Sequence, residues 1–361
     1  MLQIINSHSH IFTFDHVPER FLPFKLVRFL AKKKRYAGLA RFLSRLWPWS
    51  DKDVLDRFAS FVEQGYQKTQ DAILDSLMRF YPPDTKFVVL PMDMEYMKAG
   101  NPKESYLAQM KKLSELKNDP KYKDHLLPFV FAHPERPGVT EHVKEYILTH
   151  GFSGIKIYPP LGYYPFDKRL DEVFAFAQEM QVPVMTHCSH PVVFYKGKVK
   201  GDILINPLTG EKLKKEKNKK FADNWTHPDN YKELFRKFPD LKLCFGHFGG
   251  SSEWKTYFNH ISEEEFKNSW FYKIKELMKA YPNIYADVSY SLADDELYPM
   301  LNLIMTDSTI NDRILFGSDF YMARIEGKEF KFSAQLRVAI GEDNFRKIAM
   351  ENPVRYLENK I

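Results

Sequence analysis

The stretch GIKIYPPLGYYPFDKRLDEVFAFAQEMQVPVMTH, residues 154–187, decides the fold. It opens with a short apolar run at 154–158 and closes with another at 183–186. Between them, residues 170–180 carry apolar side chains at three- and four-residue spacing, which is typical of a helix packed on one face. Two strands joined by a helix form a βαβ unit, so this stretch predicts a parallel sheet.

The same alternation of strand and helix extends along the whole chain. The predicted strands are 2–7, 86–92, 126–132, 154–158, 183–186, 241–246, 284–288 and 313–317. The predicted helices between them include 103–117, 140–150, 170–180, 228–238, 270–281 and 294–305. Strands this apolar on both faces fit a barrel wall covered by helices. We therefore expect an α/β fold, a (β/α)₈ TIM barrel, as a single domain over residues 1–361.

Two connections are longer than an ordinary βα loop. They are residues 12–80, with a helical pattern around 57–79, and residues 189–227, where Asn206-Pro207 and Thr209-Gly210 suggest a hairpin turn. Long connections in compact domains are usually lids, binding loops or links. Both insertions follow strands that end in candidate site residues, so we expect them to be lid or cap elements over the carboxyl-terminal face of the barrel.

Composition limits the class of protein. Of the 361 residues, 44% are hydrophobic and 28% charged, and no apolar run approaches the length of a membrane span, so we expect a soluble globular protein. The first residues, MLQIINSHSH, show no secretory signal, which favours a cytoplasmic location. The two cysteines, Cys188 and Cys244, stand in apolar strand runs and are expected to be reduced.

The net charge of +6 is concentrated in the insertions: residues 20–47 hold nine Lys/Arg and no acid, and residues 189–227 hold nine Lys against four acids. A nucleic-acid binder would organise such charge with aromatic or groove-reading elements, so we do not expect a nucleic-acid partner. An alternative for the basic, aromatic segment 24–49 is an interfacial helix that binds an anionic membrane or a protein partner, instead of a lid helix packed on the barrel.

Five polar residues stand where predicted strands end. His8 and His10 end the first, His187 the fifth, His247 the sixth and Asp319 the eighth. Because strand side chains alternate with period two, His8 and His10 point to the same side. The carboxyl ends of barrel strands meet at one face, where active sites are assembled. Imidazoles and a carboxylate that converge there are suitable ligands for zinc and related divalent metals.

Seven motifs together resemble a known family. They are HSH at 8–10, HPERPG at 133–138, GFSGIKIYPPLG at 151–162, MTH at 185–187, FGHFGG at 245–250, LFGSD at 315–319 and ENPVRYL at 351–357. On these residues the sequence resembles the amidohydrolase superfamily, in particular its amidohydrolase-related branch (amidohydrolase family 2) of decarboxylases, lactonases and hydratases. The resemblance covers nearly the whole chain, and it is specific for the superfamily but not for a substrate.

The resemblance implies a divalent metal, Zn²⁺ in the first instance and one ion rather than two. The ligands that it implies are His8, His10, His187 and Asp319. His247 would orient substrate or water, or bind a second metal. Lys156 stands in the fourth strand, where binuclear relatives carry a carboxylated lysine that bridges two metals; with a single metal, its amine would instead reach an anionic group of the substrate.

The chemistry of such a site follows general rules. A bound divalent cation brings the pKa of water from ~15.7 to about 7 and polarises a carbonyl oxygen. Asp319 is expected to shuttle the proton, help that is typically worth ~10²–10⁴ in rate. A protonated His247 is expected to stabilise charge that develops on the substrate oxygen.

Other residues near these strand ends have two interpretations each. Arg136 and Arg324 are candidates to bind a substrate carboxylate through a bidentate fork, or are surface or structural arginines. Tyr158 either binds substrate or packs in the core. Asp287 either supports the metal ligands from behind or caps the following turn, and Cys188 is expected to face the helices as a buried thiol.

We therefore expect a metal-dependent hydrolase that acts on an amide, ester or lactone bond of a small, carboxylated molecule. The alternative is a non-oxidative decarboxylase with the same metal set, since both reactions use a metal to hold an anionic oxygen. The expected partner is a small-molecule substrate, and a homo-oligomer is compatible with the sequence.

Overall fold

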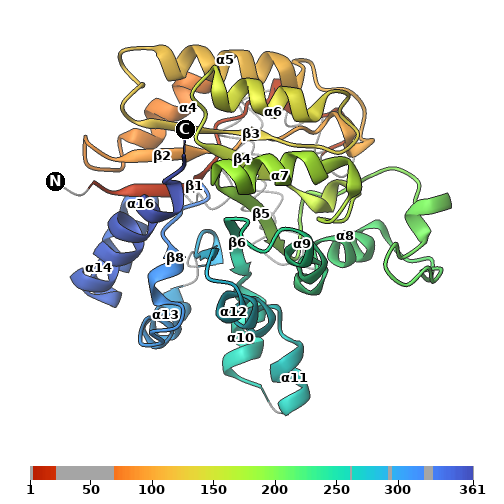
Figure 1. Cartoon of the computed structure of the whole chain (residues 1–361). Coiled ribbons are helices and arrows are strands. Elements are labelled where there is room, and N and C mark those ends of the chain that lie inside the picture. The colour runs from red at the N-terminus through yellow and green to blue at the C-terminus, as the bar shows by residue number, and fades with distance from the viewer. Residues whose placement is uncertain (1–2, 22–68, 261, 292–294, 321–327, 361) are drawn as a thin grey trace, which may run out of the picture.

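The computed structural model of the chain describes residues 3–21, 69–260, 262–291, 295–320 and 328–360 (Figure 1). Most of the insertion 12–80, the basic segment 24–49 within it, and the candidate Arg324 lie outside the described residues.

Eight strands form one parallel sheet in the order β1 to β8, so each strand pairs with the next along the chain. They are β1 (Ile5–Ser9), β2 (Lys86–Val89), β3 (Leu126–Phe131), β4 (Gly154–Ile157), β5 (Val184–Ser189), β6 (Leu243–Gly249), β7 (Ile284–Asp287) and β8 (Ile314–Leu315). The end of β8 returns to β1: Ser7 N–H donates to the Phe316 carbonyl at 2.8 Å, and Asp319 N–H donates to the His8 carbonyl at 2.9 Å. These bonds close the sheet, and the expected TIM barrel is confirmed.

Helices surround this sheet (Figure 1). They are α4 (Gln70–Met78), α5 (Tyr106–Asn118), α6 (Val139–Leu148), α7 (Asp171–Met180), α8 (Asn218–Thr226), α9 (Tyr231–Lys237), α10 (Ser251–Phe258), α11 (Glu263–Asn268), α12 (Trp270–Ala280), α13 (Tyr298–Met305), α14 (Lys328–Ile340), α15 (Glu342–Arg346) and α16 (Asn352–Leu357), with a π-helical turn, Lys347–Glu351, before α16. All six predicted helices are present, although 228–238 divides into a 3₁₀ turn, Pro228–Asn230, and α9.

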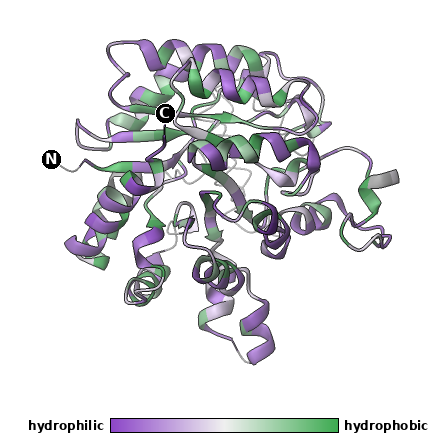
Figure 2. Cartoon of the chain, in the orientation of Figure 1, coloured by the Kyte–Doolittle hydropathy of each residue, from purple (hydrophilic) through white to green (hydrophobic). Residues whose placement is uncertain are grey.

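Helix α12 shows why these segments fold as they do. The hydroxyl of Ser269 accepts the backbone N–H of Tyr272 and caps the first turn. The apolar residues that follow are spaced three and four apart, and the buried ones are Trp270, Phe271, Ile274, Leu277 and Met278. One stripe of the helix therefore packs against the barrel while the other faces water. Figure 2 shows the same division on the other outer helices, with hydrophilic residues outward.

The interior of the barrel is filled by its own apolar cluster. Its buried members are Ile5, Val88, Leu90, Phe129, Met185, Cys244, Tyr285, Leu315 and Tyr356. Tyr356 comes from α16, which Lys242 holds at the start of β6 by donating to the backbone carbonyls of Arg355 and Glu358. Because the interior is packed, the barrel has no pore, and functional groups collect at the carboxyl ends of the strands.

The insertion 189–227 contains a hairpin turn and an apolar cluster. A bridge between Ile205 and Lys212 forms the expected hairpin turn, closed by the Gly210 N–H donating to the Asn206 carbonyl at 2.8 Å. Beside it lies a separate apolar cluster whose buried members are Tyr195, Phe221, Ala222 and Trp225. The insertion thus has a small core of its own.

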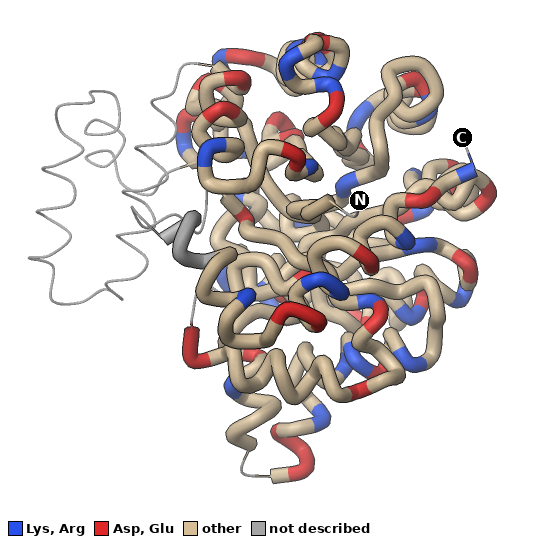
Figure 3. The backbone as a smooth tube through the Cα atoms, turned by 90° about the vertical axis from the view of Figure 1, so that its left-hand side faces the viewer, with Lys and Arg blue, Asp and Glu red and all other residues tan. Residues whose placement is uncertain are grey.

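The outer surface carries mixed charge. Figure 3 shows acidic and basic residues interspersed along the outer helices and loops of the described chain. In the described ranges, no helix combines the length and apolarity that a membrane span requires.

Candidate metal centre

A cavity of about 70 Å³ opens at the carboxyl ends of the strands. It is lined by His8, His10, Phe12, Met92, Met94, Lys156, Tyr158, His187, Ser189, His190, Val192, Val193, His247, Tyr290 and Asp319. All five residues that the strand-end pattern singled out therefore face one cavity, together with Lys156 and Tyr158.

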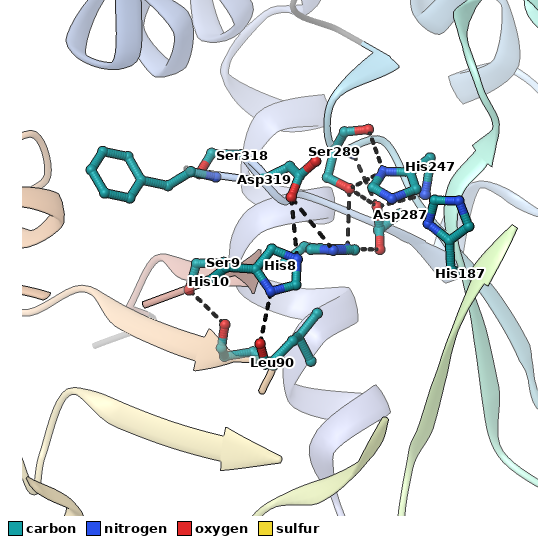
Figure 4. Close-up of polar contacts among 12 residues, drawn as sticks. His8, Ser9, His10, Leu90, His187, His247, Asp287, Ser289, Ser318 and Asp319 are labelled. Carbon is teal, nitrogen blue, oxygen red and sulfur yellow. Dashed lines mark hydrogen bonds and ion pairs between the residues drawn. The ribbon is translucent and has the colours of Figure 1, made fainter. Parts of the chain in front are cut away.

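Among the described residues, two groups of three side chains could hold an ion: His8 with His247 and Asp287 and, considered first, His8 with His10 and Asp319. The Nε2 atoms of His8 and His10 lie 3.8 Å and 3.4 Å from Oδ1 of Asp319 (Figure 4). One nitrogen from each histidine and one oxygen of Asp319 lie within 4.8 Å of one another. All three side chains are buried.

The hydrogen bonds behind these side chains set what they present to the cavity. Nδ1 of His10 lies 2.7 Å from the Leu90 carbonyl, and Nδ1 of His8 lies 2.8 Å from Oδ2 of Asp287 (Figure 4). A carbonyl or carboxylate oxygen accepts, so both Nδ1 atoms must carry the proton. Both Nε2 atoms are then lone-pair acceptors directed at a carboxylate oxygen.

Such an arrangement is suited to a bound cation. Two acceptor nitrogens and a carboxylate oxygen gain nothing from facing one another, and Nε2 of His8 makes no hydrogen bond to the described residues. Burial is the main cause that lowers the pKa of His8 well below its usual value and that of His10 to about 3, so both rings are neutral and ready to bind a metal. The donor set of two imidazoles and a carboxylate fits a divalent cation.

Glycines allow His8 to occupy its place. A Cβ on Gly317 would lie 2.7 Å from Cβ of His8, and a Cβ on Gly246 would lie 3.2 Å from Cε1 of the same ring. The glycines of the LFGSD and FGH motifs are therefore packed against the histidine. Sequence reasoning used these motifs for their His and Asp and missed the glycines.

Backbone strain also gathers at this mouth. Among the described residues, six non-glycine residues have positive φ, and four of them are His247, Phe248, Tyr290 and Asp319. A non-glycine residue in this left-handed conformation costs of order 1–3 kcal/mol of folding free energy. Such residues persist only where the surrounding structure holds them, and they cluster at active sites. Tyr290 lines the cavity and was also missed by sequence reasoning, because no motif marks it.

His187 lies in the same cavity but outside the close group of three. Its Nε2 lies 3.1 Å from the Ser189 carbonyl, so this nitrogen carries a proton and Nδ1 has the lone pair. The ring stacks on Tyr158, with centroids 4.4 Å apart. Burial raises the pKa of Tyr158 well above its usual value, so its phenol stays protonated.

His247 lines the same cavity and is buried. Burial is the main cause that lowers its pKa to about 3, with nearby His8 adding to the effect. Burial therefore favours the neutral ring in the protein without a bound ligand, and the role of a protonated His247 toward a substrate stays a prediction. Nδ1 lies 3.2 Å from the Ser289 carbonyl, so it carries the proton and Nε2 is an acceptor.

Lys156 reaches the cavity from β4. Its side chain is only 1% exposed, and its Nζ has no hydrogen-bond partner among the described residues. Burial lowers the pKa of this amine to about 8, although Asp287 and Asp319 oppose the shift. A buried amine donor directed into the cavity is suited to an anionic group.

Arg136 does not line the cavity. Its guanidinium donates to Asp93 and to Glu95, both at 2.7 Å, and lies over the ring of Tyr106 at 4.6 Å. The arginine is already paired, so of the two interpretations the structure favours the structural one. The sequence could not show this, because Asp93 and Glu95 follow a different strand.

The expectation that Cys188 is a buried thiol facing the helices is confirmed. Cys188 and Cys244 are buried and free. The thiol of Cys188 points to α8, where it donates to the Thr226 carbonyl at 3.4 Å, and burial raises its pKa well above its usual value. Asp287 is fully buried and accepts the Ser289 N–H, as a cap of the following turn would; it also contacts His8, and its support of a metal ligand stays a prediction.

A comparison with family models gives one match, the model described as Amidohydrolase, over residues 112–358. The matched range contains His187, His247 and Asp319 and leaves His8 and His10 outside. In a search of curated proteins, none matches this sequence.

Solved structures share the fold. A decarboxylase of 5-carboxyvanillate from Novosphingobium aromaticivorans, complexed with manganese and 4-hydroxy-3-methoxy-5-nitrobenzoic acid, is 15% identical, with a TM-score of 0.58 over 99% of this chain and 96% of that chain. An uncharacterised TIM-barrel protein from Bordetella bronchiseptica is 16% identical, with a TM-score of 0.54 over 99% and 98%. A 4-oxalomesaconate hydratase from Rhodopseudomonas palustris is 14% identical, with a TM-score of 0.50 over 98% and 95%.

Proposed function

Because this chain belongs to the amidohydrolase family and is a metal-dependent enzyme of that superfamily, we propose that it hydrolyses an amide, ester or lactone bond of a small, carboxylated molecule. The observation that carries the proposal is the convergence of three acceptor atoms, from His8, His10 and Asp319, at the mouth of a barrel.

One divalent ion, zinc by the chemistry of its ligands, would be held by His8, His10 and Asp319. We include His187 as the fourth ligand, because it lines the same cavity and its Nδ1 has a lone pair. A second ion would involve His247 and Lys156. When bound, a divalent ion supplies a charge that polarises a carbonyl oxygen and lowers the pKa of a coordinated water to about 7.

The remaining groups divide the other tasks. Asp319 has a second oxygen, Oδ2, with which to accept a proton and later return it to the leaving group. Nε2 of neutral His247 accepts a hydrogen bond from substrate or water, since its Nδ1 is held by Ser289. The Lys156 amine binds the substrate's carboxylate, and the phenol of Tyr158 orients the substrate as a donor.

The insertion 189–227 would act as a cap. Val192 and Val193 line the cavity, and the segment that follows is held at two points: Tyr195 N–H donates to the Pro160 carbonyl at 2.9 Å and Lys196 N–H to the Met97 carbonyl at 2.8 Å. This segment thus reaches the loops after β4 and β2. Its apolar side chains would exclude water from a bound substrate.

Metal analysis tests the first part of the proposal. Purified wild-type protein should carry about one equivalent of divalent metal, and the double variant His8→Ala/His10→Ala should lose most of it. His260→Ala removes an exposed histidine away from the cavity and should leave the metal content unchanged. Wild-type protein that holds no metal after reconstitution with zinc would overturn the assignment.

Isotope labelling tests the reaction type once a panel of small carboxylated amides, esters and lactones has given a substrate. Hydrolysis in ¹⁸O-labelled water should place the label in the product acid. Release of carbon dioxide without oxygen incorporation would instead show the rival decarboxylase reaction, which the same metal set can support.

A further inference from the structure

Asp287, at the end of β7, uses both carboxylate oxygens in the site (Figure 4). Oδ2 lies 2.8 Å from Nδ1 of His8, which is 279 positions away in the sequence. Oδ1 accepts the backbone N–H groups of His247 and Ser289, each at 3.0 Å. The cap of the turn after β7 uses only Oδ1, so it does not account for the bond between Oδ2 and His8.

Ser289 joins the same network. Its hydroxyl donates to Oδ1 of Asp287, so its oxygen is left to accept. This oxygen lies 3.1 Å from Nδ1 of His8 and 3.0 Å from Nδ1 of His247. The Ser289 carbonyl lies 3.2 Å from the same nitrogen of His247. Every group that faces the two Nδ1 atoms is therefore an acceptor.

We propose that Asp287 and Ser289 are a positioning pair that locks His8 and His247 in the tautomer protonated at Nδ1. Both Nε2 lone pairs are thereby aimed into the cavity, one toward the metal position and one toward the substrate. The part of this inference that concerns metal affinity rests on the proposed function, whereas the tautomers can be measured without a metal.

Control of the tautomer, called the lock below, explains why Asp287 and Ser289 contact two histidines from different strands. A neutral imidazole that is free to choose would place its proton on either nitrogen, and a proton on Nε2 of His8 would occupy the metal position. Outer partners of this kind fix the ring of a metal-binding histidine, and their loss typically costs 10–100-fold in metal affinity. Because Ser289 contacts both rings, the same pair also sets what His247 offers to a substrate.

The variant Asp287→Asn separates this role from the turn. The asparagine oxygen can keep the two backbone N–H groups, which leaves its NH₂ group facing Nδ1 of His8. A donor then meets a donor, so His8 must move its proton to Nε2. We expect ¹⁵N NMR of the metal-free variant to show His8 protonated at Nε2, and competition with a chromogenic chelator to show Zn²⁺ affinity about 10–100-fold weaker than in wild type.

Two variants serve as controls. Asp93→Asn alters another buried aspartate, paired with Arg136, and should cost stability while leaving the His8 tautomer and the Zn²⁺ affinity unchanged. Ser289→Ala should weaken Zn²⁺ binding less than Asp287→Asn does, since His8 keeps its carboxylate and His247 keeps the carbonyl.

An Asp287→Asn protein that keeps Nδ1–H on His8 and binds Zn²⁺ like wild type would overturn the proposal. If that variant does not fold, the metal-free wild type still decides, because Nε2–H on His8 or His247 in that protein contradicts the lock. A wild type with the expected tautomers that binds no Zn²⁺ would instead refute the proposed metal centre and leave the lock intact.

Discussion

The substitution Gly317→Ala tests whether close packing against His8 builds the metal centre. The added Cβ would lie 2.7 Å from Cβ of His8, 3.2 Å from its backbone nitrogen and 3.1 Å from Cβ of Ser289. Ordinary contacts of a Cβ begin at 3.4 Å, so the first of these distances must open by about 0.7 Å. Two of the three atoms are Cβ atoms, which can move only with their backbones.

The expected cost has two parts. Overpacking a well-filled interior typically costs about 1–3 kcal/mol of unfolding free energy. Moving His8 also displaces Nε2 relative to Asp319 and strains its bond to Asp287, so Zn²⁺ affinity should fall by about 10–100-fold, the range seen when the support of a ligand is disturbed. Urea unfolding measures the first effect, and chelator competition measures the second.

Gly151→Ala is the matched control. Gly151 has φ +67° and no atom within 4 Å of an added Cβ, so alanine there should cost backbone strain without touching the site. The control should lower stability and leave Zn²⁺ affinity unchanged. A Gly317→Ala protein as stable as wild type, with unaltered Zn²⁺ affinity, would refute the idea that this packing places His8.

Three further perturbations have definite signs. Asp319→Asn keeps the shape of the side chain and one oxygen but cannot accept a proton. Turnover should fall by ~10²–10⁴, while metal analysis should show most of the ion retained. A near-normal rate would exclude the proton-shuttle role. The pKa of Lys156 is lowered from 10.5 to about 8 in the folded protein, which therefore binds fewer protons than the unfolded chain between these values. The stability of the metal-free wild type should accordingly rise from pH 8 to 10.5, and Lys156→Met should flatten that rise in thermal unfolding. If the melting temperatures of both proteins change equally with pH, the lowered pKa of Lys156 is contradicted. His190 has its pKa raised from 6.5 to about 9, chiefly by hydrogen bonds to Asp223 and Glu253. The contribution of His190 to stability should be full below pH 6.5 and lost as pH rises through 9. The difference in melting temperature between wild type and His190→Gln should therefore disappear over that range. A difference that does not change with pH would count against the ion pairs.

The strands were predictable because their signal is local. All eight predicted runs became strands, since apolar residues repeated along four to seven positions suffice to mark a buried strand. The limits were less predictable: the first was expected at 2–7 and lies at Ile5–Ser9, and the sixth was expected at 241–246 and continues to Gly249. Pairing with neighbouring strands sets these limits, and a single segment does not contain that information.

Helices α10 and α11 show where periodicity fails. Among the residues of α10 only Trp254 is buried, and α11 buries none. Helix α11 therefore lacks the apolar stripe by which the other helices were predicted, and α10 has only a short one, Trp254 with the partly buried Tyr257 and Phe258. The Ser262 hydroxyl caps α11 by accepting the Glu265 N–H, whereas α10 has no side-chain cap and packs against the core through its aromatic residues.

By itself, the sequence determined the barrel and the set of polar residues at its mouth, because strand order and strand ends are written along the chain. His8, His10 and Asp319 could be named without coordinates, and the structure brings them together. Only the tertiary structure decided that Arg136 pairs with Asp93 and Glu95 and that Asp287 contacts His8. The physical reason is that these contacts join residues in or after different strands, 41 and 43 positions apart around Arg136 and 279 positions apart between His8 and Asp287, so they exist only once the strands have assembled into the barrel.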